Sequence, residues 1–390
     1  MSSDHDKPLK QENIDADSLN DSVTQVEDLT GILRQSLDKK TIFMIILAFS
    51  WMILFFVIGN QDEGGIGGIL EQLSHVRIEL VVLAVLITLL GLCLDAFAWR
   101  VLLKSMDVSA SINDALETYF VSFAWGLLVP SLTAAEIYVR ISLGKKRFVK
   151  KLENRSPSSG ELFSTIVLHK LLGFLVFIPL SVLVAYGLVV LLDLDATAGF
   201  VFLGFVATLT VFVIVFLGLV YKKPNIAISL LTRLISAAAA LIPPYKSKAD
   251  SHKAAARQFV NDYTLNLQLL ASHPRQASQA YLLAMLNVIC GLSGATILVY
   301  AAGGNVPIWA ILVIMFVSGT LNLIPLGIPG MEGIKETVIT PLYQRYETFS
   351  KSGAIALLNS LNTLYMPVLV GLVVQLFVTQ KKDKAILENQ

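Results

Sequence analysis

Seven ionisable side chains lie within otherwise apolar stretches of this 390-residue sequence, where they could bind a polar substrate or carry protons. They are Glu136, Arg140, His169, Lys170, Glu332, Lys335 and Glu336. A charged group in apolar surroundings is costly and usually faces a cavity or a partner, so each is a candidate site residue. The sequence contains no HExxH, GxSxG, Walker A or dinucleotide-binding pattern. We therefore predict no catalytic residue, no metal and no cofactor.

Glu136 and Arg140 are four residues apart, which places them on one face of a helix with the acid first. That order favours a local salt bridge. A guanidinium can alternatively bind a phosphate group through two parallel hydrogen bonds. Both interpretations stay open: Arg140 is either a substrate ligand or a structural partner of Glu136.

The other candidates also have two interpretations each. Lys170, beside His169, could line a cavity or extend its ammonium group to the membrane surface. Glu332 and Glu336 repel each other at a spacing of four residues unless Lys335, a cation or a proton intervenes. One of these carboxylates could therefore couple transport to protons, or Lys335 could simply neutralise the pair.

Three further polar features have structural explanations. We expect Asp95 to form an interfacial ion pair with Arg100. Asp193 and Asp195 satisfy a metal-binding D-x-D pattern, but aspartates also suit a short turn, which is the favoured interpretation. A polar group at the start of the last apolar run fits hydrogen bonding between helices; it consists of Asn359, Ser360, Asn362 and Thr363.

The elements that position these residues are long apolar segments. The sequence is 55% hydrophobic and only 15% charged, against about a quarter charged in soluble domains. Runs such as Thr41–Gly59, Leu80–Phe97, Thr197–Val220 and Ala354–Val378 are long enough to cross a hydrocarbon core, which takes about 20 residues. The net charge of +1 gives no indication of nucleic-acid binding.

The positions of Lys and Arg predict the orientation, because cytoplasmic loops hold them in excess. Both termini and the basic run from Arg140 to Arg155 are expected in the cytoplasm. The apolar segment Ala115–Val139 precedes that run and cannot cross the membrane once without placing it outside. Because Pro130 also interrupts the segment, we predict a re-entrant hairpin of two half-helices.

By the same reasoning, residues 307–341 form a second hairpin that enters from the opposite face. Its helix breakers are Pro325, Gly327, Pro329 and Gly330. The predicted fold is an all-α polytopic membrane protein of about eight membrane segments, with six full spans and two re-entrant broken-helix hairpins in two inverted-topology repeats. The expected divisions are a polar, partly disordered cytoplasmic segment (1–40), a first repeat (41–192), a second repeat (193–379, with a cytoplasmic loop at 221–280) and a cytoplasmic tail (380–390).

The two hairpins resemble the transmembrane, flippase-like domain of lysylphosphatidylglycerol synthases and its stand-alone relatives. The first motif runs from Gly126 to Pro130 and on to Ala135, Glu136 and Arg140. The second runs from Ile324 to Gly333, with Glu336 beyond. The likeness extends from about Ala96 to Leu376.

The sequence departs from the family pattern at several positions. Ala134 and Ala135 replace a glycine pair, His169 and Lys170 stand where Glu-Arg is usual, and the last span lacks an arginine near Asn359. The resemblance implies a translocase in the cell membrane without the soluble synthase domain, acting on an anionic phospholipid or a polyprenyl-phosphate-linked lipid. The alternative is an integral-membrane enzyme that modifies lipid-linked substrates, with Glu136, Glu332 or Glu336 as acid–base groups. A membrane lipid is the expected partner, nucleic acid is not, and the oligomeric state stays open.

Overall fold

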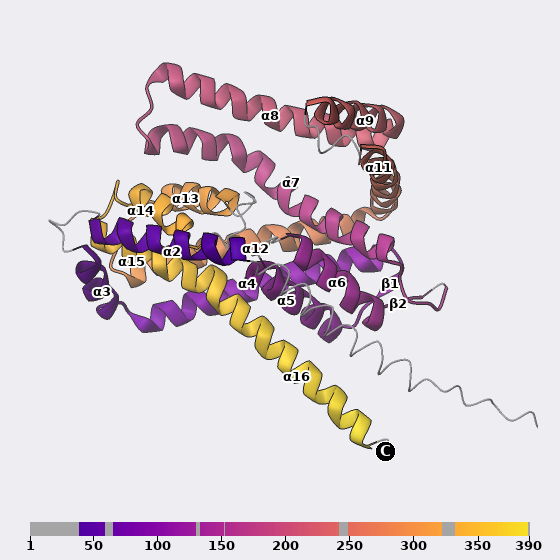
Figure 1. Cartoon of the computed structure of the whole chain (residues 1–390), viewed down its shortest axis with the longest axis horizontal. Helices are drawn as coiled ribbons and strands as arrows, with labels where there is room; N and C mark the ends of the chain where they lie inside the picture. Colours follow the sequence, from indigo (N-terminus) through magenta and orange to yellow (C-terminus); the bar gives the residue numbers. More distant parts are fainter. Residues whose placement is uncertain are drawn as a thin grey trace, which may run out of the picture.

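The computed structural model describes residues 39–58, 65–129, 133–151, 153–241, 249–321 and 332–388. These residues are almost wholly helical, with one short two-stranded ribbon among them (Figure 1). The helices are α2 (Lys39–Ile58), α3 (Gly65–Ser74), α4 (Ile78–Ser105), α5 (Ile112–Leu128), α6 (Thr133–Arg147), α7 (Ser159–Leu191), α8 (Ala196–Lys222), α9 (Pro224–Leu241), α11 (Ala249–Ser272), α12 (Pro274–Ala301), α13 (Ile308–Leu321), α14 (Ile334–Tyr343), α15 (Phe349–Ser360) and α16 (Met366–Glu388). A π-helical segment, Leu361–Tyr365, joins α15 to α16.

Several of these helices are suited to lipid. Within the described ranges, four are long and apolar enough to cross a membrane: Ile78–Ser105, Ala196–Lys222, Pro274–Ala301 and Phe349–Phe377. Helix α8 also exposes Phe200, Val201 and Phe205, with 77%, 68% and 66% of their surface accessible. A soluble protein rarely leaves so large an apolar face bare. Three of the four predicted runs therefore lie in membrane-type helices, whereas the first, Thr41–Gly59, contains only the shorter apolar helix Ile46–Ile58.

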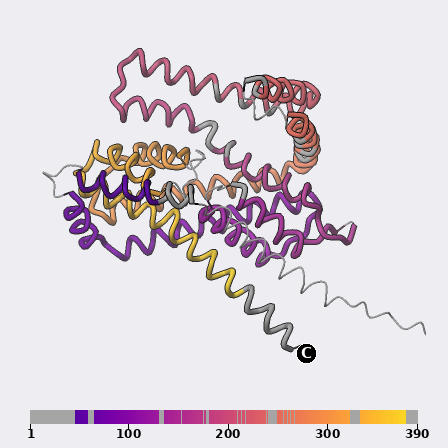
Figure 2. Tube along the Cα trace, in the orientation of Figure 1, coloured from indigo at the N-terminus to yellow at the C-terminus, as the bar shows by residue number. Residues whose placement is uncertain are grey.

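Helices α4 and α12 form the centre of the molecule, and they lie together along much of their length (Figures 1 and 2). Two glycines allow this close approach. A Cβ atom on Gly91 of α4 would lie 2.9 Å from Asn287 Oδ1, and one on Gly294 of α12 would lie 2.6 Å from Thr88 Oγ1. Small residues at a helix crossing bring two backbones together, which is how membrane helices associate without a hydrophobic driving force.

The first predicted hairpin corresponds to α5 and α6, which pack against each other. The chain enters α5 at Ser111, whose hydroxyl accepts a hydrogen bond from Asp114 N at 3.0 Å. Pro130, the predicted break, lies outside the described residues. Helix α16 crosses α5 at Gly371, where a Cβ atom would meet the carbonyl oxygen of Phe120 at 2.5 Å.

The second predicted hairpin corresponds to α13 and α14, which are in contact with each other. Its predicted breaks, Pro325, Gly327, Pro329 and Gly330, all lie outside the described residues. Helix α7 crosses α13 at Gly187, where a Cβ atom would lie 2.5 Å from Val313 Cγ2. Each predicted hairpin is thus crossed by another long helix, and the crossing helix has a glycine at the point of contact.

Helix α7 is one unbroken helix of 33 residues, about 50 Å long at 1.5 Å per residue. It begins with a capping box, in which Ser158 and Glu161 satisfy each other's backbone N–H groups. A short turn leads to α8, and α9 and α11 close the far end of this α7–α8 pair (Figure 1). The stretch 221–280, predicted as a cytoplasmic loop, therefore contains two helices and the start of α12.

Residues that follow α4 and α6 form the two-stranded ribbon. Strand β1 (Val108–Ser109) pairs antiparallel with β2 (Val149–Lys150), with Val108 opposite Lys150 and Ser109 opposite Val149. The ribbon ties the basic segment after α6 to the end of α4.

Candidate functional site

Arg140 lies at the centre of a buried polar network formed by α4, α5, α6 and α7. Its side chain has no accessible surface. The guanidinium carbon lies 4.9 Å from the centre of the Trp99 ring and 4.7 Å from that of Tyr119. Both aromatic rings attract the positive charge, and the attraction strengthens when water is excluded. The two rings therefore fix the position of the guanidinium.

Hydrogen bonds occupy the polar edge of the same guanidinium. Arg140 Nη2 donates to Glu136 Oε1 at 2.5 Å, and Nε donates to Ser122 Oγ at 3.1 Å. The Nη1 atom lies 3.4 Å from His169 Nδ1. Arginine can only donate, so Nδ1 must carry the lone pair and the proton of a neutral imidazole resides on Nε2.

His169 connects Arg140 to Asp95. Its Nε2 atom lies 3.2 Å from Asp95 Oδ1, while the hydroxyl of Tyr119 donates to Asp95 Oδ2. The prediction that Asp95 pairs with Arg100 was wrong, because the Nε atom of Arg100 instead donates to Ala110 O at 2.9 Å. Five residues of α-helix turn through about 500°, so the two side chains leave the helix in different directions.

Glu136 bridges two cations. One carboxylate oxygen binds Arg140, and the other accepts from Lys170 Nζ at 2.7 Å. The Glu136 side chain is 8% exposed, whereas that of Lys170 is 45% exposed. Lys170 is thus the accessible end of a network whose other cation is buried.

In this first network two carboxylates (Asp95 and Glu136) lie with two cations (Arg140 and Lys170). A balanced, hydrogen-bonded network is the arrangement in which buried charges are tolerated. The local salt bridge predicted for Glu136 and Arg140 is present.

A second network surrounds α14 and contains Glu332, Lys335 and Glu336, all at most 6% exposed. Lys335 Nζ donates to Glu332 Oε1 at 3.0 Å and lies 4.0 Å from Glu336 Oε1. Two carboxylates therefore lie near one ammonium group, which is the neutralisation by Lys335 that was one of the two interpretations. The three groups carry a net charge of −1 when all are ionised, and such an excess is costly in apolar surroundings unless a proton or cation offsets it.

Residues at the two ends of the π-helical segment donate hydrogen bonds to these carboxylates. Ser360, just before the segment, donates to Glu336 Oε1, and Tyr365, its last residue, donates to Glu332 Oε2 at 3.2 Å. Single π-helical turns inside α-helices frequently occur at functional sites. Asn362 within the segment donates to Thr88 Oγ1 of α4 at 2.8 Å, which is the kind of interhelical hydrogen bond predicted for this polar group.

Gly333 permits the entry into α14. Its φ of +86° lies in the region that favours glycine, and its backbone N–H donates to Glu336 Oε2 at 2.6 Å. A Cβ atom there would lie 2.5 Å from the carbonyl oxygen of Ala48 in α2. The glycine therefore allows both the turn and the close approach of α2.

The seven predicted residues fall into two networks rather than one. Within the described part of the chain, no hydrogen bond or ion pair joins the network of Arg140 to that of Lys335. The sequence reasoning missed Trp99, Tyr119 and Ser122 as partners of Arg140. A signal existed for Trp99, which follows Asp95 by four residues and so shares its helix face.

Metal binding receives no support from the described residues, among which no group of three or more His, Cys, Asp or Glu side chains could hold an ion. Asp195 accepts a hydrogen bond from Ala198 N at 2.8 Å and caps α8, and Asp193 adopts a φ of 53° in the preceding turn. The turn interpretation of these aspartates agrees with this geometry.

Long apolar helices that enclose charged networks define a multi-pass α-helical membrane protein. The chain belongs to the family of the lysylphosphatidylglycerol synthase TM region, whose model matches residues 43–371. A more distant relative is UPF0104 membrane protein PH1989 of Pyrococcus horikoshii, which is 20% identical over 309 residues that cover 79% of this chain and 89% of that protein. The resemblance inferred from the two hairpin motifs is therefore confirmed.

Proposed function

We propose that this protein moves an anionic lipid between the two leaflets of the cell membrane, either a phospholipid or a polyprenyl-phosphate-linked lipid. The observation that carries the proposal is the bridge of Glu136 between Arg140 and Lys170. A carboxylate that binds two cations occupies the place where a phosphate group, with more oxygens and more charge, would fit. Family membership supports a role connected with membrane lipids.

In this mechanism Lys170 makes the first contact with the headgroup, because its side chain is the exposed part of the network. The phosphate displaces Glu136 from Lys170 and then competes for Arg140, a fixed guanidinium that can bind phosphate bidentately. The second network (Glu332, Lys335 and Glu336) supplies a site for a proton or cation on the other half of the protein.

The inverted-repeat architecture is part of the proposal, and two pairs of helix contacts support it. Gly91 and Gly294 make reciprocal contacts between α4 and α12. Helix α16 crosses the first hairpin at Gly371, and α7 crosses the second at Gly187. If residues 41–192 and residues 193–379 are two repeats of one fold, a contact made by one repeat should have an equivalent in the other, as it does in each of these pairs. Transporters with broken helices are commonly built from such inverted repeats.

The test is lipid transfer in sealed vesicles that contain the purified protein and a fluorescent anionic phospholipid in one leaflet. Lys170→Gln should abolish accelerated transfer, whereas Lys253→Gln, which removes a surface ion pair on α11, should leave it unchanged. The enzyme alternative predicts substrate turnover in detergent, where no leaflets exist. Turnover in detergent together with wild-type rates for Lys170→Gln in vesicles would contradict the proposal.

A further inference from the structure

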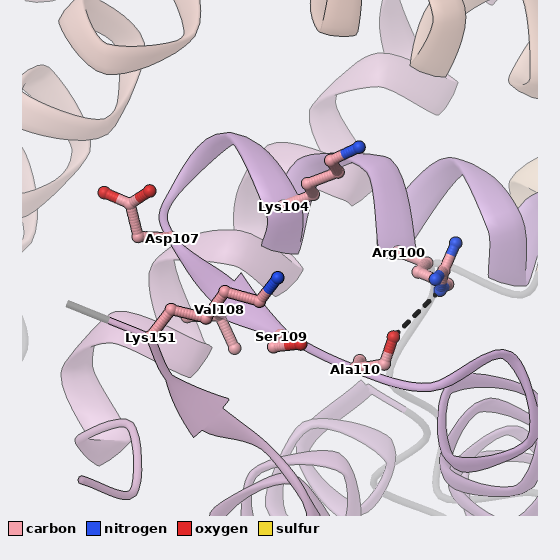
Figure 3. A pocket seen from close by; sticks show the side chains of 7 residues that line it. All are labelled: Arg100, Lys104, Asp107, Val108, Ser109, Ala110 and Lys151. Carbon is pink, nitrogen blue, oxygen red and sulfur yellow. Dashed lines mark hydrogen bonds between the residues drawn. The ribbon is translucent and has the colours of Figure 1, made fainter. Parts of the chain in front are cut away.

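A second concentration of positive charge lies outside both networks, at the end of α4. A pocket of about 320 Å³ is formed there by α4, strand β1 and the residue after strand β2 (Figure 3). Arg100, Lys104 and Lys151 contribute three cations to its wall, and Asp107 contributes one carboxylate. The wall therefore has a formal charge of +2.

The fold brings these groups together from two separate segments. Arg100 and Lys104 are four residues apart and share a face of α4. The β1–β2 pairing carries Lys151 to the same place, where its backbone N–H donates to Asp107 O at 3.0 Å. Figure 3 shows the side chains that line the pocket, with the carboxylate of Asp107 pointing away from the three basic groups in this view.

The charges of this pocket are less compensated than those of nearby basic residues. Arg147 pairs with Glu117, and Lys150 pairs with Glu153 and Glu161. Among the described residues, neither Lys104 nor Lys151 forms an ion pair, and the one hydrogen bond of the Arg100 side chain goes to Ala110 O. The pocket thus offers three cationic groups to a ligand.

The size, charge and position of the pocket select the ligand class. It lies at the end of the apolar helix Ile78–Ser105, which is long enough to cross a membrane. Its described lining residues include no aromatic ring on which a nucleobase could stack. Lys and Arg residues just beyond the cytoplasmic end of a membrane helix attract anionic headgroups, and Asp107 can accept a hydrogen bond from a headgroup hydroxyl.

We propose that Arg100, Lys104 and Lys151 form a binding site for a phosphate group, in the first instance that of an anionic phospholipid with a hydroxylated headgroup. The site is separate from the network of Arg140, although Arg100 follows Trp99, which packs on Arg140. It rests on the orientation predicted from the positions of Lys and Arg, which puts this end of α4 at the cytoplasmic surface, and not on lipid transport. Binding at equilibrium requires no transport, so failure of one proposal leaves the other standing.

The experiment is a thermal-shift titration of the purified full chain in neutral detergent. The probes are short-chain phosphatidylglycerol, short-chain phosphatidylcholine and inorganic phosphate. Phosphatidylglycerol should raise the Tm, and the apparent affinity should fall as salt is added. In the Lys104→Gln/Lys151→Gln variant that affinity should fall roughly 30-fold, because each basic residue near an anionic surface contributes about fivefold.

Two variants separate the pocket from general charge effects. Lys222→Gln/Lys223→Gln removes the same charge at the end of α8 and should bind like wild type. Asp107→Asn should bind phosphatidylglycerol about fivefold more tightly, by the same charge rule, and asparagine tolerates the φ of 59° at this position. This gain does not depend on whether the lysine variant folds.

The three probes also identify the source of the phosphate. Tighter binding of phosphatidylglycerol than of inorganic phosphate assigns the site to a lipid headgroup, whereas equal binding of the two assigns it to free phosphate. Either result supports a phosphate site. Equal affinity of wild type, Lys104→Gln/Lys151→Gln and Asp107→Asn for every probe would overturn it.

Discussion

Arg140 Nη2 lies 2.5 Å from Glu136 Oε1, one helical turn away, in a place where the arginine side chain has no accessible surface. Removing one partner of such a pair strands the other charge in apolar surroundings. We predict that Arg140→Gln lowers the free energy of unfolding by about 3–5 kcal/mol, and that Glu136→Gln in the same chain restores most of it. The measurement is the Tm in detergent, with the exposed Arg275→Gln as a neutral control.

Transport by the same variants separates the two roles of Arg140. If the arginine binds substrate, the double variant recovers its Tm but not lipid transfer in vesicles. Recovery of both quantities would leave Arg140 as a structural partner of Glu136 and contradict its role as a ligand.

The unequal charges around Lys335 lead to a second prediction. Lys335→Met leaves Glu332 and Glu336 buried together with no cation, so it should be the most destabilising change in this network, by about 3–5 kcal/mol. Glu332→Gln removes the excess negative charge and should raise the Tm or leave it unchanged. A Tm for Lys335→Met equal to that of wild type would show that a proton, and not Lys335, neutralises the pair.

Gly333→Ala tests the turn into α14. Alanine is strained at a φ of +86°, which costs about 1–3 kcal/mol, and its Cβ atom would also collide with the carbonyl oxygen of Ala48. The Tm should fall accordingly. Gly218→Ala is the matched control, since it lies within α8 with no atom within 4 Å of the added Cβ; there alanine should stabilise the helix by up to about 1 kcal/mol.

Glu161 provides a prediction about pH, because it lies in the first turn of α7, at the polar end of that helix. Burial alone would raise its pKa, but hydrogen bonds from Arg155, Lys150 and Ser158 outweigh burial and lower the pKa of Glu161 to about 2. A lowered carboxyl pKa stabilises the folded state fully above the unfolded value of about 4.3. That contribution is lost as the pH falls through about 2.

The size of this effect is limited, since the Glu161 side chain is 30% exposed. Solvent screening reduces the contribution to the order of 1 kcal/mol. The Tm of wild type should therefore fall between pH 4.5 and 2 more steeply than that of Glu161→Gln. Parallel curves for the two proteins would contradict the role of the hydrogen bonds.

Orientation can be tested with single cysteines placed in a Cys93→Ala/Cys290→Ala background. Intact cells treated with a membrane-impermeant thiol reagent should show labelling at Asp193→Cys and Asn305→Cys but not at Lys145→Cys. All three side chains are exposed in the structure, so a difference reports the side of the membrane. Labelling at Lys145→Cys alone would invert the proposed topology.

The sequence predicted helix type and local pairs better than long-range partners. The spacing of Glu136 and Arg140 identified their salt bridge, because that geometry belongs to a single helix. The contact of Asp95 with His169 joins residues 74 positions apart, and no local rule specifies it. The expectation that Asp95 pairs with Arg100 failed because nearness in sequence does not place two side chains on the same helix face.

Aromatic residues were missed for a different reason. Trp99 and Tyr119 lie in apolar runs, where a ring that binds a cation has the same sequence signature as one that only packs. The π-helical segment also leaves no sequence signature that distinguishes it from α-helix. Its effect becomes visible only through Ser360 and Tyr365, which donate hydrogen bonds to Glu336 and Glu332 from the two ends of the segment.

That π-helical segment also sets the rotational phase between α15 and α16. An α-helix turns about 100° per residue, and a π turn contains one more residue than an α turn. If Leu361–Tyr365 became α-helical while Ser360 stayed on Glu336, α16 would turn by roughly 100°. Gly371 would then leave the face of α5 at Phe120. A change from π-helical to α-helical hydrogen bonding beside Glu336 would thus alter the contact between α16 and α5, the first helix of the first predicted hairpin.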